Sequence, residues 1–187
     1  MNFFRCAQTV PEALARAVAA MPHSRRLFSA LKRINLDCLD PISRAARFVW
    51  SVHRSFGGCP NNEFVTSRVG SGGGLKSTAS IAAAIIACAA RFDRVILECL
   101  DWRICLKKYD APATFFYLDP PYLGCEAGHH DLARVLKGIK AKWLLTIGDT
   151  SLMRELYRGY PVRRISTAQS LKKGLRGRFR QLLIRSF

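Results

Sequence analysis

Acidic residues are scarce in this sequence, and none occurs after Glu155. The 187 residues contain 13 Asp and Glu against 30 Lys and Arg, so the formal net charge is +17. A charge of this size favours a polyanionic partner, either nucleic acid or an anionic membrane surface. The basic residues after Glu155 are interleaved with aromatic and apolar residues, which favours a folded basic face over a solvated tail.

The sequence also lacks the marks of metalloproteins, secreted proteins and membrane proteins. It has seven Cys, an odd number, but no C-x-x-C pair and no signal peptide, and none of its four His has metal-ligand spacing with a Cys. We therefore expect no metal site, and reduced thiols in a cytoplasmic protein. The apolar run from Ile81 to Ala90 is Ala-rich and too short to cross a bilayer, so we expect a soluble helix and no membrane contact.

Apolar patterns and turn residues indicate helices first and an α/β region after them. Hydrophobic residues make up 49% of the chain, enough for a sizeable core. The expected helices cover 11–20, 41–54, 78–92, 102–109, 129–138 and 151–158. The expected strands are 94–100, 115–118 and 143–147, with a closing hairpin of 162–166 and 181–187. From residue 94 onward strands alternate with helices, which indicates an α/β sheet.

The most specific motif is Asp119-Pro120-Pro121-Tyr122, which directly follows the expected strand at 115–118. The two prolines end the strand and fix the backbone at the strand end where open α/β sheets bind ligands. A planar base with an exocyclic amine suits this site. The carboxylate and a carbonyl accept hydrogen bonds from the amine, and the ring stacks on the base. An ordinary Pro turn has the same residues, so the motif needs support from its context.

The context resembles the carboxyl-terminal two-thirds of the Dam-like family of DNA adenine-N6 methyltransferases. The resemblance runs along the whole chain, and its segments are similar to family stretches such as "PYSR", "RAARF…NRxxFNG" and "CxDF". Each segment apart from DPPY is weak alone, but their common order is hard to obtain by chance. In chain order they are 1–5, 22–25, 44–48, 53–58, 98–102, 119–122, 141–146 and 180–187.

The resemblance implies methyl transfer from S-adenosylmethionine to a flipped-out adenine in double-stranded DNA, as in restriction–modification systems. Asp119 and the Pro120 carbonyl then hold the adenine amine, Pro121 completes the rigid turn and Tyr122 stacks on the base. Asp101 and Trp102 border the adenine ring of the cofactor, with Asp119 beside it, and Asp101 also caps a helix. The candidate DNA-binding residues are Arg25, Arg47, Arg54, Lys172, Lys173 and Arg176.

The resemblance further implies two regions and an incomplete sheet. Residues 1–93 correspond to a mostly helical target-recognition region, and 94–187 to the α/β catalytic half with its C-terminal hairpin. Family members begin with a "KWAGGK"-like segment, a Gly-rich "EPFxGxG" turn after strand 1 and an acidic residue after strand 2. These parts bind the methionine and ribose of the cofactor, and this sequence contains none of them.

The family's strand order, 3-2-1-4-5-7-6, places the missing strands between 94–100 and 115–118. We therefore expect an incomplete Rossmann-like methyltransferase sheet. Three explanations stay open: a complementary N-terminal polypeptide, a truncated gene product, or direct pairing of the two flanking strands in a rearranged sheet.

Two other functions also stay open. A non-catalytic DNA-binding remnant keeps the basic region but holds no cofactor. A P-loop nucleotide hydrolase is suggested by 70–77, but Leu75 stands where that motif needs Gly before the Lys, which favours a loop in the target-recognition region. We interpret His129 and His130 as helix-start residues near the cleft rather than as general bases.

Overall fold

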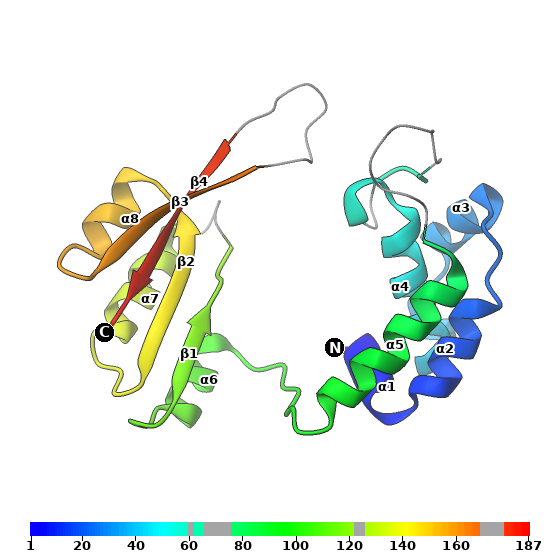
Figure 1. Ribbon diagram of the computed structural model, residues 1–187, viewed down its shortest axis with the longest axis horizontal. Coiled ribbons are helices and arrows are strands. Elements are labelled where there is room, and N and C mark those ends of the chain that lie inside the picture. The colour runs from blue at the N-terminus through cyan, green and yellow to red at the C-terminus, as the bar shows by residue number, and fades with distance from the viewer. Residues whose placement is uncertain (60–61, 66–75, 122–125, 169–177) are drawn as a thin grey trace. The chain divides into compact units, whose positions relative to one another are not determined.

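The computed structural model describes residues 1–59, 62–65, 76–121, 126–168 and 178–187. The chain divides into two compact units, Met1–Cys99 and Leu100–Phe187 (Figure 1). Each unit has a hydrophobic core of its own, so each is described separately. The boundary suggested by the sequence, between 93 and 94, lies inside the first unit.

The first unit is built from helices. They are α1 (Asn2–Thr9), α2 (Pro11–Ala19), α3 (Arg25–Arg33), α4 (Pro41–Arg54) and α5 (Thr78–Phe92), with short 3-10 helices at Leu36–Cys38 and Phe56–Gly58. Helices α2 and α4 begin with Pro11 and Pro41, at a position where a missing N–H costs nothing. Asp40 Oδ1 caps α4 by accepting hydrogen bonds from the backbone N–H groups of Ile42 and Ser43, at 2.9 and 3.1 Å.

Helices α1, α2, α4 and α5 bury their apolar faces against one another. Small side chains at the contacts let the helices approach closely. The buried cluster is Cys6, Ala7, Leu14, Ala15, Val18, Ala45, Ala46, Val49, Ile81 and Ile85. Helix α3 was not among the expected elements. Its start was nevertheless readable from the sequence, because Ser24 Oγ accepts a hydrogen bond from the Leu27 N–H as an N-cap.

The second unit is an α/β structure. Its elements are α6 (Trp102–Tyr109), β1 (Phe115–Leu118), α7 (Glu126–Leu136), β2 (Lys142–Gly148), α8 (Ser151–Leu156), β3 (Val162–Ala168) and β4 (Arg178–Arg185). The four strands form one mixed sheet in the order β1-β2-β4-β3. Strands β1 and β2 are parallel, whereas β4 is antiparallel to both β2 and β3. The expected strands at 115–118 and 143–147 and the closing hairpin are confirmed.

Helices α6, α7 and α8 contribute to a single core against one face of this sheet. The sheet side of that core comes from alternate residues of the strands, namely Phe116, Leu118, Trp143, Leu145, Ile147, Leu182 and Ile184. The intervening residues of β1 point the other way and are exposed: Phe115 is 53% and Tyr117 61% accessible. The opposite face of β1 therefore exposes more than half of the surface of two aromatic side chains.

The expected strand at 94–100 is wrong, because these residues form no strand in the structure. The backbone of this segment is bound elsewhere: Gln8 Nε2 on α1 donates to the carbonyls of Phe92 and Val95, both at 2.9 Å. Ile96 is 78% exposed, so this apolar segment is not the buried strand that its sequence suggested. The described pairing of β1 is with β2.

The described strands and helices make a mixed α/β protein, which confirms the α/β class predicted from the sequence. Across the described ranges, no helix is both long and apolar enough to pass through a membrane.

Candidate functional site

Asp119 and Pro120 lie at the carboxyl end of β1, where the sequence predicted the site. Because β1 and β2 run parallel, the carboxyl end of β1 also approaches residues of β2. Thr146 of β2 lies with its Oγ1 3.0 Å from Asp119 Oδ1, and donates a hydrogen bond to that oxygen. The Asp119 side chain is exposed to solvent, and the hydrogen bond from Thr146 of β2 orients its carboxylate. Tyr122 lies outside the described residues.

Thr146 is the polar centre of this strand end. This polar side chain is only 6% exposed and lies among apolar neighbours in β2. Besides Asp119, its Oγ1 lies 3.3 Å from the Leu118 carbonyl and 3.3 Å from the Tyr117 hydroxyl. A buried threonine with three oxygens around it fixes the end of β1 to β2 and sets the direction of the Asp119 carboxylate.

A cavity of about 580 Å³ opens beside Asp119, within the second unit. This volume is in the range of small-molecule sites, about 300–1,000 Å³. Its walls are mostly apolar and come from α6, β1 and α7. The lining residues are Leu100, Trp102, Cys105, Leu106, Phe116, Tyr117, Leu118, Asp119, Pro120, Pro121, Gly128, His129 and Leu132. The cavity therefore brings together Asp119, Pro120, Pro121 and Trp102, four of the predicted site residues.

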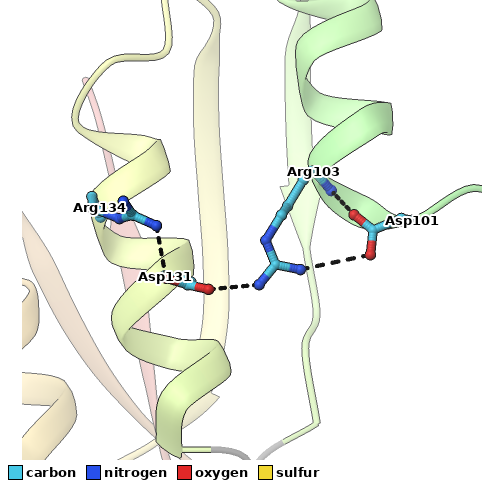
Figure 2. A network of polar contacts seen from close by, with 4 residues as sticks. All are labelled: Asp101, Arg103, Asp131 and Arg134. Atoms are coloured by element: carbon cyan, nitrogen blue, oxygen red, sulfur yellow. Dashed lines mark hydrogen bonds and ion pairs between the residues drawn. The ribbon is translucent and has the colours of Figure 1, made fainter.

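Asp101 begins α6 and acts as its N-cap. Its Oδ1 accepts a hydrogen bond from the Arg103 backbone N–H at 2.9 Å, so the capping role expected from the sequence is confirmed. Figure 2 shows that Arg103 continues from there to α7: its guanidinium lies 3.6 Å from Asp101 and 2.6 Å from Asp131. Asp131 also binds Arg134 at 2.9 Å. This network ties together the two helices that wall the cavity.

The same network alters the acidity of Asp131. Hydrogen bonds from Arg103 and then from Arg134 lower the pKa of the Asp131 carboxyl below its ordinary value. A lowered carboxyl pKa in the folded state means that the network stabilises the fold above the ordinary pKa of 3.8, and that this stabilisation is lost as the pH falls below it. Because the network is exposed, its contribution to stability is small.

The predicted DNA-binding residues lie in different environments. Arg25 is exposed at the start of α3, over the ring of Phe64. Arg47 is half-buried and donates from Nε to the Leu31 carbonyl at 2.7 Å. Arg54 is only 1% exposed and donates to the Lys76 carbonyl at 2.8 Å. Of these three, Arg25 is the one that solvent reaches freely. Lys172, Lys173 and Arg176 lie outside the described residues.

His53 and His23 lie close to Arg54. Burial, and then the positive charges of Lys76 and Arg54, lower the pKa of His53 below its ordinary value of 6.5. Burial and then Arg54 lower the pKa of His23 in the same direction. Protonation of His53 and His23 beside Arg54 is therefore disfavoured in the folded chain. The P-loop-like stretch lies outside the described residues up to 75, and Ser77 then caps α5 by accepting from the Ser80 N–H.

Two features of the site were missed or dismissed in the sequence. Thr146 was considered only as part of the expected strand 143–147. A polar residue inside this apolar run could have indicated that it has a role at the site. His129 was interpreted as a helix-start residue near the cleft. It is 4% exposed and lines the cavity, whereas the adjacent His130 is exposed. Helix α7 begins at Glu126, earlier than expected.

Comparison with known proteins gives no family for this chain: neither a family model nor a curated protein matches it. Within the described ranges, no group of three or more His, Cys, Asp and Glu side chains is arranged to hold a metal ion. The site is therefore interpreted from its own chemistry and from the motif resemblance.

Proposed function

We propose that this chain is the target-recognition and catalytic part of a site-specific DNA adenine-N6 methyltransferase of the Dam-like type. The observation that carries the proposal is the Asp119 carboxylate, oriented by Thr146 at the end of a parallel strand and placed at the rim of an apolar cavity. In this proposal residues 1–187 recognise the DNA and hold the target adenine, and the reaction also needs a Gly-rich turn and a second-strand carboxylate to bind the cofactor.

The chemistry asks little of the protein beyond positioning. S-adenosylmethionine, when bound, supplies an electrophilic methyl group on a sulfonium. Asp119 accepts a hydrogen bond from the adenine N6 amine, and the Pro120 carbonyl accepts a second. These bonds hold the amine with its lone pair directed at the methyl group and stabilise the positive charge that develops on nitrogen. The extra proton then leaves N6 for solvent, and no covalent enzyme intermediate is needed.

The cavity fits one part of the cofactor. Trp102, Phe116 and Leu132 are apolar walls against which a planar ring packs. Asp119 lines the cavity, and Asp101 directly precedes Trp102 of its wall in the same unit. The methionine and ribose have no counterpart in residues 1–187, because the Gly-rich turn and the second-strand carboxylate are not in this sequence. We therefore expect the described chain to hold the cofactor weakly.

The sheet supports the proposal through its strand order. If β1, β2, β3 and β4 are strands 4, 5, 6 and 7 of the family, the order β1-β2-β4-β3 is the 4-5-7-6 portion of the Rossmann-like methyltransferase order. The family's remaining strands then belong beside β1. That is the strand whose described pairing is on one edge alone, and whose Phe115 and Tyr117 are exposed.

A strand edge that pairs with none of the described residues, beside exposed aromatic side chains, is a surface that another strand covers in most folded proteins. We therefore include a complementary segment, which carries the cofactor-binding turn, among the partners of this chain. The segment adds to the edge of β1 and covers Phe115 and Tyr117. Whether it belongs to another polypeptide or to more of the same one does not alter this argument.

Double-stranded DNA is the proposed substrate. The net charge of +17 supplies the electrostatic attraction, and helix α3 presents Arg25, Arg26, Lys32 and Arg33 as exposed side chains. Contacts from such residues position a protein on the phosphate backbone more often than they read bases.

A second candidate is a DNA-binding remnant without catalysis, and the unpaired edge of β1 is the observation that favours it. Cofactor binding separates the two candidates. The complementary segment is added to the chain, and S-adenosylmethionine binding is measured by calorimetry with and without it. Binding that appears only with the segment supports the methyltransferase, whereas no binding in either case supports the remnant.

A further inference from the structure

The sheet of the second unit carries three basic side chains in a row on the face opposite its core. Leu144 of β2 lies opposite Arg185 of β4, so Lys142 is a diagonal neighbour of Arg185. Leu183 of β4 lies opposite Arg163 of β3, so Arg163 is a diagonal neighbour from the other side. All three basic side chains are exposed. Long side chains at diagonal positions of a sheet are within reach of one another, so three positive charges lie side by side across β2, β4 and β3.

Nothing acidic in the described chain balances this row of charge. The four strands contain no Asp or Glu, and none of the three cations forms an ion pair with a described residue. The ring centroid of Phe187 lies 5.9 Å from Lys142 Nζ and 5.5 Å from Arg185 Cζ, which attracts both cations without neutralising them. Like charges at neighbouring sheet positions are unfavourable, so an anionic partner on this face relieves the repulsion.

The same face is apolar beside the cations. Leu144 and Leu183 are half-buried, and Phe115 and Phe187 are 53% and 50% exposed. A hollow of about 310 Å³ lies here, and its lining residues are Leu144, Pro161, Val162, Arg163, Leu183 and Arg185. An apolar floor with two guanidinium groups at its rim suits a partner that presents an apolar side chain between acidic ones.

We propose that this basic face, made of Lys142, Leu144, Arg163, Leu183 and Arg185, docks an acidic amphipathic helix of the complementary segment. The inference rests on the proposed function for the existence of that segment. The apolar stripe of the helix covers the two leucines, and its Asp and Glu side chains pair with the three cations. A helix is the expected occupant because sheets of α/β proteins carry helices on both faces, and α6, α7 and α8 all contribute to the core on the other face.

The described helices of this chain do not supply the acidic partner. In the first unit, α2 has one acidic residue, Glu12, and α1, α3, α4 and α5 have none. Helices α7 and α8 contain acidic residues but belong to the core on the opposite face. A second copy of the basic face is disfavoured as the occupant, because its positive charges meet positive charges. The acidic helix therefore comes from outside the described ranges.

The test uses a fluorescent peptide of about 18 residues, or about five helical turns, with a stripe of Leu flanked by Glu. Its binding to the full chain is measured by fluorescence anisotropy at about 150 mM salt, which screens distant charges. A scrambled peptide of the same composition has no stripe and measures the attraction of a chain of charge +17 for any acidic peptide. We expect the amphipathic peptide to bind at least about tenfold more tightly, since burying even one leucine side chain is worth that factor.

Charge reversal then locates the binding surface. Lys142→Glu and Arg185→Glu should each weaken the amphipathic peptide about tenfold, because each replaces an attraction with a repulsion. Lys137→Glu is the matched control. It makes the same change of charge at an exposed residue directly after α7, and should keep nearly the wild-type affinity. A peptide with Lys in place of Glu should prefer the double variant Lys142→Glu/Arg185→Glu to the wild-type chain, which a merely structural role of these residues does not produce.

Several results overturn the proposal. The amphipathic peptide binds no better than the scrambled one, or Lys137→Glu weakens it as much as Lys142→Glu does. A single-stranded oligonucleotide of dT that binds more tightly than the peptide, and loses that affinity in Lys142→Glu, shows instead that the face takes nucleic acid. If a charge reversal unfolds the chain, judged by circular dichroism, Lys142→Gln and Arg185→Gln replace it, with a smaller loss of the same sign expected and no loss overturning the proposal.

None of these measurements uses methyl transfer, so the two claims fail separately. A chain that binds the acidic helix through the basic face but methylates no DNA once the complementary segment is supplied counts against the proposed function alone. A chain that methylates adenine with the segment, while its peptide binding is the same in Lys142→Glu and in Lys137→Glu, counts against the basic face alone.

Discussion

The hydrogen bond between Thr146 and Asp119 gives the sharpest prediction about the candidate site. Thr146→Val replaces the hydroxyl with a methyl group of similar size, so the packing of β2 is kept. It removes the bond to Asp119 Oδ1 at 3.0 Å and the contacts with the Leu118 carbonyl and the Tyr117 hydroxyl at 3.3 Å. One hydroxyl has one proton to give, so one donated bond is lost, together with the bond that Thr146 Oγ1 accepts from the exposed Tyr117 hydroxyl.

The size of the effect follows from the exposure of the acceptor. An ordinary hydrogen bond contributes about 0.5–1.5 kcal/mol to stability, and one to a charged group about 1.5–3 kcal/mol. Asp119 is exposed, so water replaces the lost donor and the lower range applies. We expect a loss of about 1 kcal/mol, or about fivefold in the unfolding equilibrium. If the second unit melts as a domain of its own size, its midpoint falls by about 4–8 °C.

Thermal denaturation followed by circular dichroism measures this effect on the full chain. Thr146→Ser is the matched control, because it keeps the hydroxyl and should recover most of the lost stability. In the methyl-transfer assay, Thr146→Val should also be slower, since the Asp119 carboxylate is no longer held in one direction. A valine variant that melts with the wild type, or a serine variant that melts with the valine variant, shows that this hydroxyl does not hold Asp119.

Three further predictions follow from charge, sequence content and pKa. The chain should bind duplex DNA with an affinity that falls steeply between about 50 and 200 mM salt; a flat salt titration contradicts this. The chain alone should bind S-adenosylmethionine more weakly than about 1 μM, or about −8 kcal/mol, and tighter binding by calorimetry shows that the missing turn is not needed. Because burial lowers the pKa of His53 in the folded state, neutral His53 contributes stability that is present above its ordinary pKa of 6.5 and is lost as the pH falls below it. His53→Gln should reduce this loss in melting curves recorded between about pH 8 and pH 5, whereas His130→Gln should leave it unchanged.

Much of the second unit was predictable, because its signals are local. Phe115–Leu118 is a short aromatic run ended by two prolines, and Lys142–Gly148 is a compact apolar run, so both strands were found. The closing hairpin was found from its apolar runs on either side of a basic stretch. The parallel pairing that brings Thr146 to Asp119 is a property of register, which no local pattern specifies.

The strand expected at 94–100 was wrong because a local pattern does not specify whether a strand finds a partner. Its apolar residues suit a buried strand, but a strand needs a partner, and none is described beside it. The carbonyls of Phe92 and Val95 are instead taken by Gln8, 84 and 87 residues earlier in the chain. Helix α7 shows a similar limit: it begins earlier than expected, and helix ends are the least certain feature of a sequence prediction.

The measurement that tests the central claim most directly is methyl transfer to duplex DNA with the complementary cofactor-binding segment supplied. Tritiated S-adenosylmethionine is the donor, and the DNA is digested to nucleosides for identification of the product. We expect N6-methyladenine from the wild-type chain and almost none from Asp119→Ala, while Asp119→Ala keeps the wild-type fold and duplex affinity. Full activity in Asp119→Ala, or a methyl group found on cytosine, contradicts the assignment of this site.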